Sequence, residues 1–123
     1  MELGTFSVSL NVEDLAASQN FYAALGFVPL VGDGETWMLM GNGPHVIGLF
    51  EDLLEENLMT FNPGWAAPGV PADRYTDVRE LSRRFREVGI ETLVDNTGDT
   101  PAGPASFTVI DPDGNVIMFD QHV

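Results

Sequence analysis

The residues best suited to acid–base chemistry lie at the carboxyl end of the chain, where His122 follows Asp120 by two positions. In a β-strand, such residues project to one face and lie about 7 Å apart along the strand. An imidazole beside a carboxylate can act as a general base or contribute to a divalent metal site. We therefore take Asp120 and His122 as catalytic or metal-binding candidates. The alternative is a frayed polar terminus, because His122 is the penultimate residue.

The sequence offers few residues that suit other kinds of catalysis or metal binding. The chain has no cysteine, which excludes thiol catalysis, disulfides and thiolate metal sites. Ser7 and Ser9 have no general base near them in sequence. His45, the remaining histidine, begins an expected strand and fits a rim or core-edge position better than a ligand position. The glycine-rich segments 32–34 and 41–43 are typical of hairpin turns rather than of a phosphate-binding loop.

The composition of the chain limits which kinds of molecule it is expected to bind. A chain of 123 residues with 44% hydrophobic residues has the size of one ordinary domain. Its formal net charge of −14, with no lysine, repels phosphate backbones and anionic lipids, so neither nucleic acid nor a membrane is expected as a partner. No apolar run approaches the roughly 20 residues that cross a bilayer, and the start of the chain does not resemble a leader. We expect a cytoplasmic protein.

All five cationic side chains lie within one window of 13 residues: Arg74, Arg79, Arg83, Arg84 and Arg86. Such a cluster could form an anion-binding face. The spacing of Glu80, Arg83, Arg84 and Glu87 instead favours ion pairs three and four residues apart along a helix surface. We favour the ion pairs.

The first half of the chain predicts one β-α-β-β-β module, at about residues 5–50. Apolar and polar residues alternate from Phe6 to Val12, which indicates a strand with its apolar side toward a core. Asp14 is a suitable N-cap for a helix that carries Leu15, Ser18, Phe21, Tyr22 and Leu25 and stops at Gly26. Three further strands are expected at 27–31, 35–40 and 45–50.

The second half predicts a similar module at about residues 58–122, after an acidic linker at about 51–57. A strand is expected at 58–62. The prolines that follow it exclude a helix or a central strand up to Ala72. A second helix begins at Asp77, has Glu80 at the capping-box position, buries Val78, Leu81, Phe85 and Val88, and stops at Gly89. The remaining strands are expected at 90–94, 105–110 and 116–121, the last two joined by the turn Asp111-Pro112-Asp113-Gly114.

Two segments carry a resemblance to a known family. Val12-x-Asp14-Leu15, Ser18, Phe21-Tyr22 and Leu25-Gly26-Phe27 resemble the opening module of the vicinal oxygen chelate superfamily, which includes glyoxalase I, bleomycin-resistance proteins and extradiol dioxygenases. The segment 111–119 resembles its terminal hairpin. The resemblance covers nearly the whole chain. It implies an α+β fold in which two β-α-β-β-β modules form a curved mixed sheet within one domain, with helices on the convex side.

In metal-dependent members of that superfamily, four strand positions on the concave side of the sheet hold a divalent ion. Carried onto this chain, the positions on the first, fourth and last strands fall on Ser7, Gly48 and Met118, and the fifth-strand position falls within 58–62. None is His, Asp or Glu, so no cofactor is predicted at the inherited site. The alternative is a divalent metal held elsewhere by Asp120, His122 and a further acidic residue.

The same resemblance implies a cleft lined by apolar, aromatic and neutral polar side chains, a composition typical of small-molecule pockets. The expected ligand-binding residues are Ser7, Ser9, Asn11, Val46, Gly48, Phe50 and Met118, with Trp37, Phe61 and Trp65 at the walls. Each tryptophan fits a structural core equally well.

Three functions follow from these observations. The first is metal-independent binding of a small apolar or aromatic molecule, as in the bleomycin-resistance branch. The second is a metal-dependent lyase or dioxygenase of the glyoxalase type, and the third is a structural or regulatory dimer with a vestigial cleft. A homodimer is expected in each case, because a half-open sheet leaves strand edges and an apolar face to be covered.

Overall fold

The computed structural model describes residues 1–98 and 100–123. The chain forms two compact units. We call Ser7–Leu58 the amino-terminal unit, and Met1–Phe6 together with Met59–Val123 the carboxyl-terminal unit. The first six residues therefore belong to the same unit as the second half of the chain.

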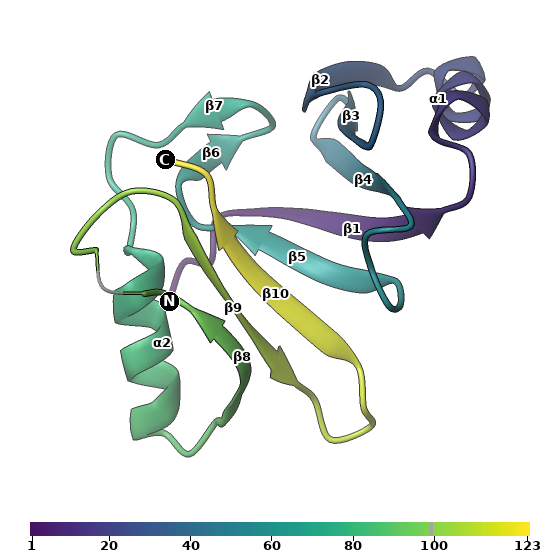
Figure 1. Cartoon of the computed structure of the whole chain (residues 1–123). Coiled ribbons are helices and arrows are strands. Elements are labelled where there is room, and N and C mark those ends of the chain that lie inside the picture. The colour runs from purple at the N-terminus through teal and green to yellow at the C-terminus, as the bar shows by residue number, and fades with distance from the viewer. Residues whose placement is uncertain (99) are drawn as a thin grey trace. The chain divides into compact units, whose positions relative to one another are not determined.

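The amino-terminal unit has the predicted β-α-β-β-β order (Figure 1). Its elements are β1 (Thr5–Val12, whose first two residues lie in the carboxyl-terminal unit), α1 (Leu15–Ala24), β2 (Val28–Gly32), β3 (Trp37–Asn42) and β4 (His45–Glu51). The strands are ordered β2-β3-β4-β1, with β1 parallel to β4 and the other pairs antiparallel. Leu15 of α1 packs with Met40 and Leu49 to form the core of this unit.

Burial along β1 corrects one expectation. The alternating pattern correctly predicts the strand, but Ser7 and Ser9 are only 8% and 4% exposed, whereas Phe6 and Val8 are exposed at the surface. The apolar residues that reach the core are Leu10 and Val12, further along the strand. The apolar side of β1 is therefore covered only in its second half. Alternation predicts which residues share a face, but not which face is covered.

The first helix is likewise less buried than its spacing suggests. Asp14 is the N-cap as predicted, and its carboxylate accepts the backbone N–H of Ala17 at 3.1 Å. Leu15 is the buried residue of this helix. Phe21 and Leu25 are 56% and 57% exposed, so part of the predicted apolar face is uncovered in the chain, whereas Tyr22 packs against the core.

The carboxyl-terminal unit repeats the plan with one insertion. Its elements are β5 (Leu58–Asn62), β6 (Trp65–Ala67), β7 (Val70–Pro71), α2 (Val78–Glu87), β8 (Thr92–Asn96), β9 (Ala105–Ile110) and β10 (Val116–Gln121). The main strands are ordered β5-β10-β9-β8, with β10 parallel to β5. The short strands β6 and β7 pair only with each other, which is compatible with the surrounding prolines.

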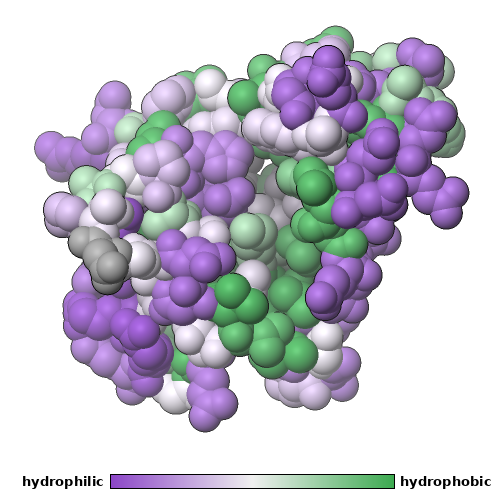
Figure 2. All heavy atoms as spheres, in the orientation of Figure 1, coloured by the Kyte–Doolittle hydropathy of each residue, from purple (hydrophilic) through white to green (hydrophobic). Residues whose placement is uncertain are grey.

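One side of these strands packs against α2 (Figure 1). Val78, Leu81 and Phe85 of the helix are buried against Phe107, Val109 and Phe119 of β9 and β10. Val88 was predicted on the same helix face but is exposed, because α2 ends one residue before it. The opposite side of α2 is charged, and Figure 2 shows hydrophilic residues gathered over this helix.

Two strands begin two residues later than predicted, each because the preceding residues are used by a turn. Gly89 adopts a left-handed φ of 86°, and the N–H of Ile90 donates to the carbonyl of Phe85, so these residues close α2 and β8 begins at Thr92. The Asp33 carboxylate accepts the N–H groups of Glu35, Thr36 and Trp37, so β3 begins at Trp37 rather than at Glu35. The hairpin around 111–114 is confirmed.

No helix formed by the described residues, 1–98 and 100–123, has the length and apolarity needed to cross a membrane.

Candidate functional site

The strand register places the expected site residues of the amino-terminal unit on one face of its sheet. Ser7 and Ser9 of β1 pair with Val46 and Gly48 of β4, and Asn11 pairs with Phe50. On the other side of β4, Trp37 of β3 pairs with Phe50. Because paired residues project to the same side of a sheet, all seven expected lining residues of this unit share a face. They are Ser7, Ser9, Asn11, Trp37, Val46, Gly48 and Phe50.

Two aromatic rings dominate this face. The rings of Trp37 and Phe50 are nearly parallel, at an interplanar angle of 7° with their centroids 6.3 Å apart. The Phe50 ring also lies over Gly48, since a Cβ added there would be 2.7 Å from Phe50 Cε2 and 3.0 Å from Leu39 Cδ2. A longer side chain at position 48 would therefore displace the Phe50 ring. We call Trp37, Phe50 and the backbone of Gly48 the aromatic platform.

The polar residues beside the aromatic platform differ in their burial and in their hydrogen bonds. Ser7 and Ser9 are buried, next to Val46 and Gly48 in the register. Asn11 is exposed, and its Oδ1 accepts the N–H of Leu54 at 3.3 Å while its own N–H donates to Asn57 Oδ1 at 2.9 Å. Asn11 therefore fixes the segment between β4 and β5, and its carbonyl oxygen is already used.

In the carboxyl-terminal unit, the register separates two residues that were expected to line one cleft. Met118 of β10 pairs with Thr60 of β5 and Thr108 of β9, on the side of the sheet away from α2. Phe61 is one position further along β5 and pairs with Phe119. Its ring stacks on that of Phe119, at 5.7 Å and 13°, and it packs against the core on the α2 side. Phe61 is therefore a core residue, and it does not share a face with Met118.

Asp120 and His122, the candidates for acid–base chemistry, are brought together. His122 Nε2 lies 3.0 Å from Asp120 Oδ2, and both side chains are about one-third exposed. The edge of the His122 ring meets Trp65 of β6, with the ring centroids 5.5 Å apart. The carboxylate and the indole together restrict the orientation of the imidazole. This unit thus contains an oriented, solvent-accessible histidine.

A buried amide lies on the same side of the sheet. Asn62 is two positions after Thr60 on β5, as Asp120 is two positions after Met118 on β10, so the two residues share the side away from α2. Asn62 Oδ1 accepts the N–H of Gly64 at 3.0 Å, whereas its Nδ2 is buried and lacks a hydrogen-bond partner among the described residues. Such unpaired buried donors are uncommon in folded proteins and often mark places where a ligand or water binds.

The sequence analysis did not identify Gln121, whose buried side chain joins several segments of this unit. Its side chain is 1% exposed. Its Oε1 accepts the N–H of Val78 at the start of α2, and its Nε2 donates to Asp77 Oδ2 and to the carbonyls of Gly103 and Val123. Burial opposes ionisation of Asp77, but the hydrogen bonds from Gln121 and Arg79 outweigh it and lower the pKa of the carboxyl.

A glutamine on a strand gives no sequence signal for such a role. Gln121 alternates with Asp120 and His122 along the strand, so its side chain projects to the opposite face. This alternation is the one feature of the sequence that could have suggested its burial.

The residues present do not fit the metal site that the family resemblance implies. The resemblance places the ligand positions of metal-dependent members at Ser7, Gly48 and Met118 and within residues 58–62, and none of these residues has an imidazole or carboxylate side chain. Among residues 1–98 and 100–123, no group of three or more His, Cys, Asp or Glu side chains comes together. Asp120 and His122 therefore have no third ligand from the described part of the chain.

Solved structures resemble this one over nearly its whole length. NAD-dependent benzaldehyde dehydrogenase from Legionella pneumophila matches with a TM-score of 0.70 at 18% identity, covering 96% of this chain and 99% of that chain. Methylmalonyl-CoA epimerase from Mycobacterium tuberculosis matches with a TM-score of 0.64 at 14% identity, covering 100% and 93%. A glyoxalase/bleomycin resistance protein/dioxygenase superfamily member from Vibrio splendidus 12B01 matches at 0.60 and 18%, covering 94% and 97%. These similarities confirm the α+β fold and do not identify a substrate for this chain.

No curated protein matches the chain in sequence. The family model for the Glyoxalase/Bleomycin resistance protein/Dioxygenase superfamily, however, matches residues 5–119. That range includes both modules, the aromatic platform and all but the last two residues of β10. The chain belongs to the Glyoxalase/Bleomycin resistance protein/Dioxygenase superfamily.

Proposed function

We propose that this chain binds a small, largely apolar or aromatic molecule at the aromatic platform of its amino-terminal unit, without a metal ion. The observation that carries the proposal is the pair of nearly parallel rings of Trp37 and Phe50, the second of which lies over Gly48. Flat aromatic ligands gain contact area and favourable stacking on such a surface. The neighbouring serine hydroxyls add neutral hydrogen-bonding groups of the kind that orient small ligands.

The position of the platform supports this proposal. Gly48 is a position at which metal-dependent relatives carry a ligand, and here the space for a side chain is filled by the Phe50 ring. The scaffold is retained, but an aromatic surface takes the place of a coordinating group. Apolar contact rather than chelation is the chemistry that these residues offer.

A thermal-shift screen with small aromatic compounds tests this proposal. We expect a subset to raise the melting temperature of the wild type, because a ligand that binds only the folded state stabilises it by mass action. Trp37→Leu should abolish the shift. Phe21→Leu is the matched control, since it removes an exposed aromatic ring of α1 in the same unit. Equal shifts in the two variants would contradict the platform as the site.

Metal content gives a second test. Protein purified without chelator should contain no stoichiometric zinc, nickel, iron or manganese by elemental analysis. A full equivalent of any of these metals would contradict the metal-independent part of the proposal.

A second candidate function, proton transfer by His122, is favoured by its 3.0 Å contact with Asp120. A carboxylate at this distance orients the imidazole, which is the usual arrangement of a general base. The same pair was the basis for the alternative of a metal-dependent lyase or dioxygenase. If His122→Ala leaves both the metal content and any discovered activity unchanged, the acid–base and the metal-dependent roles should both be abandoned.

A further inference from the structure

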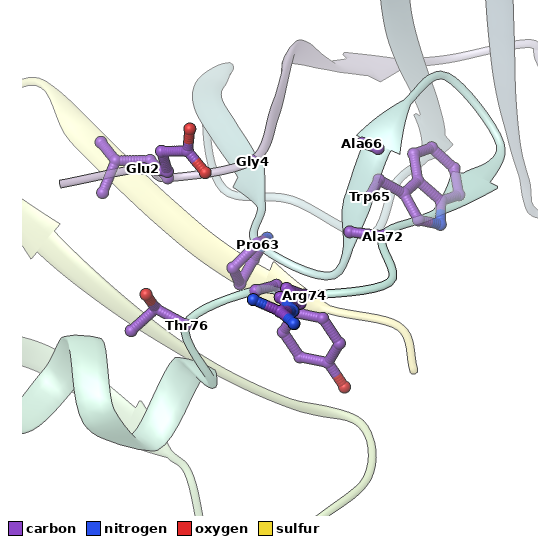
Figure 3. A pocket seen from close by; sticks show the side chains of 10 residues that line it. Glu2, Gly4, Pro63, Trp65, Ala66, Ala72, Arg74 and Thr76 are labelled. Carbon is purple, nitrogen blue, oxygen red and sulfur yellow. The ribbon is translucent and has the colours of Figure 1, made fainter.

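The carboxyl-terminal unit contains a pocket with a volume of about 410 Å³. It lies among three segments: the residues before β1, the turn from β5 into β6, and the segment between β7 and α2 (Figure 3). Its walls combine apolar and aromatic side chains with polar and charged groups. The lining residues are Glu2, Leu3, Gly4, Pro63, Trp65, Ala66, Ala72, Arg74, Tyr75 and Thr76. A volume of this size is within the range of small-molecule sites.

One wall of the pocket depends on a close approach of two backbone segments. Gly4 has a φ of 84°, and a Cβ at this position would lie 1.9 Å from the carbonyl oxygen of Asn62. Only glycine permits this contact. The adjacent Thr5 hydroxyl donates to the carbonyl of Trp65 at 3.1 Å. The segment before β1 is thus held against the turn that carries Pro63 and Trp65, so the pocket is a built feature of this unit.

Arg74 is the positively charged residue that lines this pocket. Arg79, Arg83, Arg84 and Arg86 all form ion pairs with acidic side chains, and the pairs of Arg83 and Arg84 are those expected from the spacing along the helix. Arg74 forms no ion pair or hydrogen bond with any residue in the described ranges, 1–98 and 100–123. In a chain of net charge −14, a cation that has no partner among the described residues therefore lines this pocket.

The other charges restrict what Arg74 can bind. A guanidinium presents a planar fork of donors that matches a carboxylate in a bidentate arrangement. Glu2 lines the same pocket, and its negative charge opposes a second anionic group there. A ligand with one negative charge and an apolar body satisfies both the charged and the apolar parts of the lining. A phosphate, with more charge and no apolar body, satisfies only Arg74.

We propose that this pocket binds a small organic monocarboxylate with an aromatic or aliphatic body, its carboxylate on Arg74 and its body against Pro63 and Trp65. This site is separate from the aromatic platform, because every lining residue belongs to the carboxyl-terminal unit. Its ligand is charged, whereas the platform offers contacts for a neutral molecule. The two sites can be tested independently.

The test uses Trp65 as its own reporter. In a Trp37→Phe chain, Trp65 is the sole tryptophan and lines the pocket. Phenylacetate should change its emission in a saturable manner. Phenylacetamide, which has the same body without the charge, should bind at least tenfold more weakly, and inorganic phosphate should compete poorly. Equal affinity for the acid and the amide, phosphate binding as tight as that of phenylacetate, or no saturable response to phenylacetate at millimolar concentration would each overturn the proposal.

Two variants assign the binding to the pocket charges. Arg74→Gln should lower the affinity for phenylacetate at least tenfold, and Glu2→Gln should raise it. Arg84→Gln is the matched control, because Arg84 pairs with Glu80 on the outer side of α2. Unchanged binding in Arg74→Gln, or an equal loss in Arg84→Gln, would contradict the role of Arg74. A melting curve on each variant shows that the chain remains folded.

Discussion

At the scale of single residues, Gln121 connects more of the carboxyl-terminal unit than any candidate site residue does. Its side-chain amide joins the start of α2, the loop at Gly103 and the end of the chain through four hydrogen bonds. Each partner is a backbone group or a carboxylate that needs compensation when it is buried. A single side chain thus holds together segments that are distant in sequence.

Replacing Gln121 by leucine should therefore lower the free energy of unfolding, although leucine adds buried apolar surface. Leucine is similar in size but leaves the Val78 N–H without its acceptor, whereas the carbonyl of Gly103 keeps its hydrogen bonds from Arg79. Leaving a buried polar group unsatisfied costs about 1–3 kcal/mol, so we expect a loss of that order in the free energy of unfolding. Urea denaturation measures this loss. Asn20→Leu, at an exposed position of α1, should change stability by less than about 0.5 kcal/mol. Similar losses in both variants would contradict the role of Gln121.

Single residues also show which parts of the candidate site could be predicted from the sequence and which could not. Alternation along β1 and β4 correctly placed Ser7, Gly48 and Phe50 on one face. The same reasoning failed for Phe61, because which face of β5 lies with Met118 depends on the pairing of β5 with β10. A one-residue shift of register exchanges the two faces, and no residue within a strand encodes it.

At the scale of elements, carboxylates organise the turns. The side-chain hydroxyl of Thr36, followed by the N–H groups of Thr36, Trp37 and Glu35, holds the pKa of Asp33 well below its usual range. The Asn115 amide and nearby N–H groups similarly lower the pKa of Asp111 in the β9–β10 hairpin. These carboxylates accept several hydrogen bonds only while they are ionised. They therefore favour the folded turns more when they are charged.

Stability should consequently fall in acid. A carboxyl whose pKa is lowered by folding binds protons more readily in the unfolded chain, where its pKa is about 3.9. Its contribution is present above that value and is lost as pH falls from about 4 toward the lower pKa of the folded state. Urea midpoints at pH 6, 4.5 and 3 measure the loss, and Asp33→Asn should reduce the difference between pH 4.5 and 3. Glu13→Gln removes a charge without removing these hydrogen bonds, and an equal effect of that variant would contradict the assignment.

Element type was predictable from sequence because caps and turns carry strong local signals. Asp14 and Asp77 are N-caps, and the segment 111–114 forms the expected turn. The boundaries of β3 and β8 were wrong, because Asp33 and Gly89 extend the preceding turns by hydrogen bonds to following residues. The hairpin of β6 and β7 was not predicted. Its strands have three and two residues, too short for a periodic signal.

At the scale of the whole molecule, the uncovered apolar residues support the prediction of a homodimer. Phe21 and Leu25 of α1 and Val28 of β2 are each more than half exposed and lie close together in sequence. Monomeric proteins seldom leave large apolar patches in water. Closed two-fold pairing of identical chains is the commonest way to cover them. The net charge of −14 opposes this association, but salt screens that repulsion.

We therefore expect a dimer mass in sedimentation equilibrium at moderate salt, with association strengthening as ionic strength rises. Phe21→Ser combined with Val28→Ser should weaken the dimer, whereas Val70→Ser changes an exposed apolar residue of β7 and serves as the control. A wild-type monomer that persists at micromolar concentration would show the prediction to be wrong.

The confinement of all cationic side chains to residues 74–86 also determines where trypsin can cut. Four of the five susceptible peptide bonds follow arginines of α2, which become accessible to a protease only when the helix opens. The fifth follows Arg74, in the exposed non-helical segment at the pocket. Native digestion therefore begins beside the pocket, and a molecule bound to Arg74 shields that bond. The amino-terminal unit contains no tryptic site and survives as part of one uncut fragment.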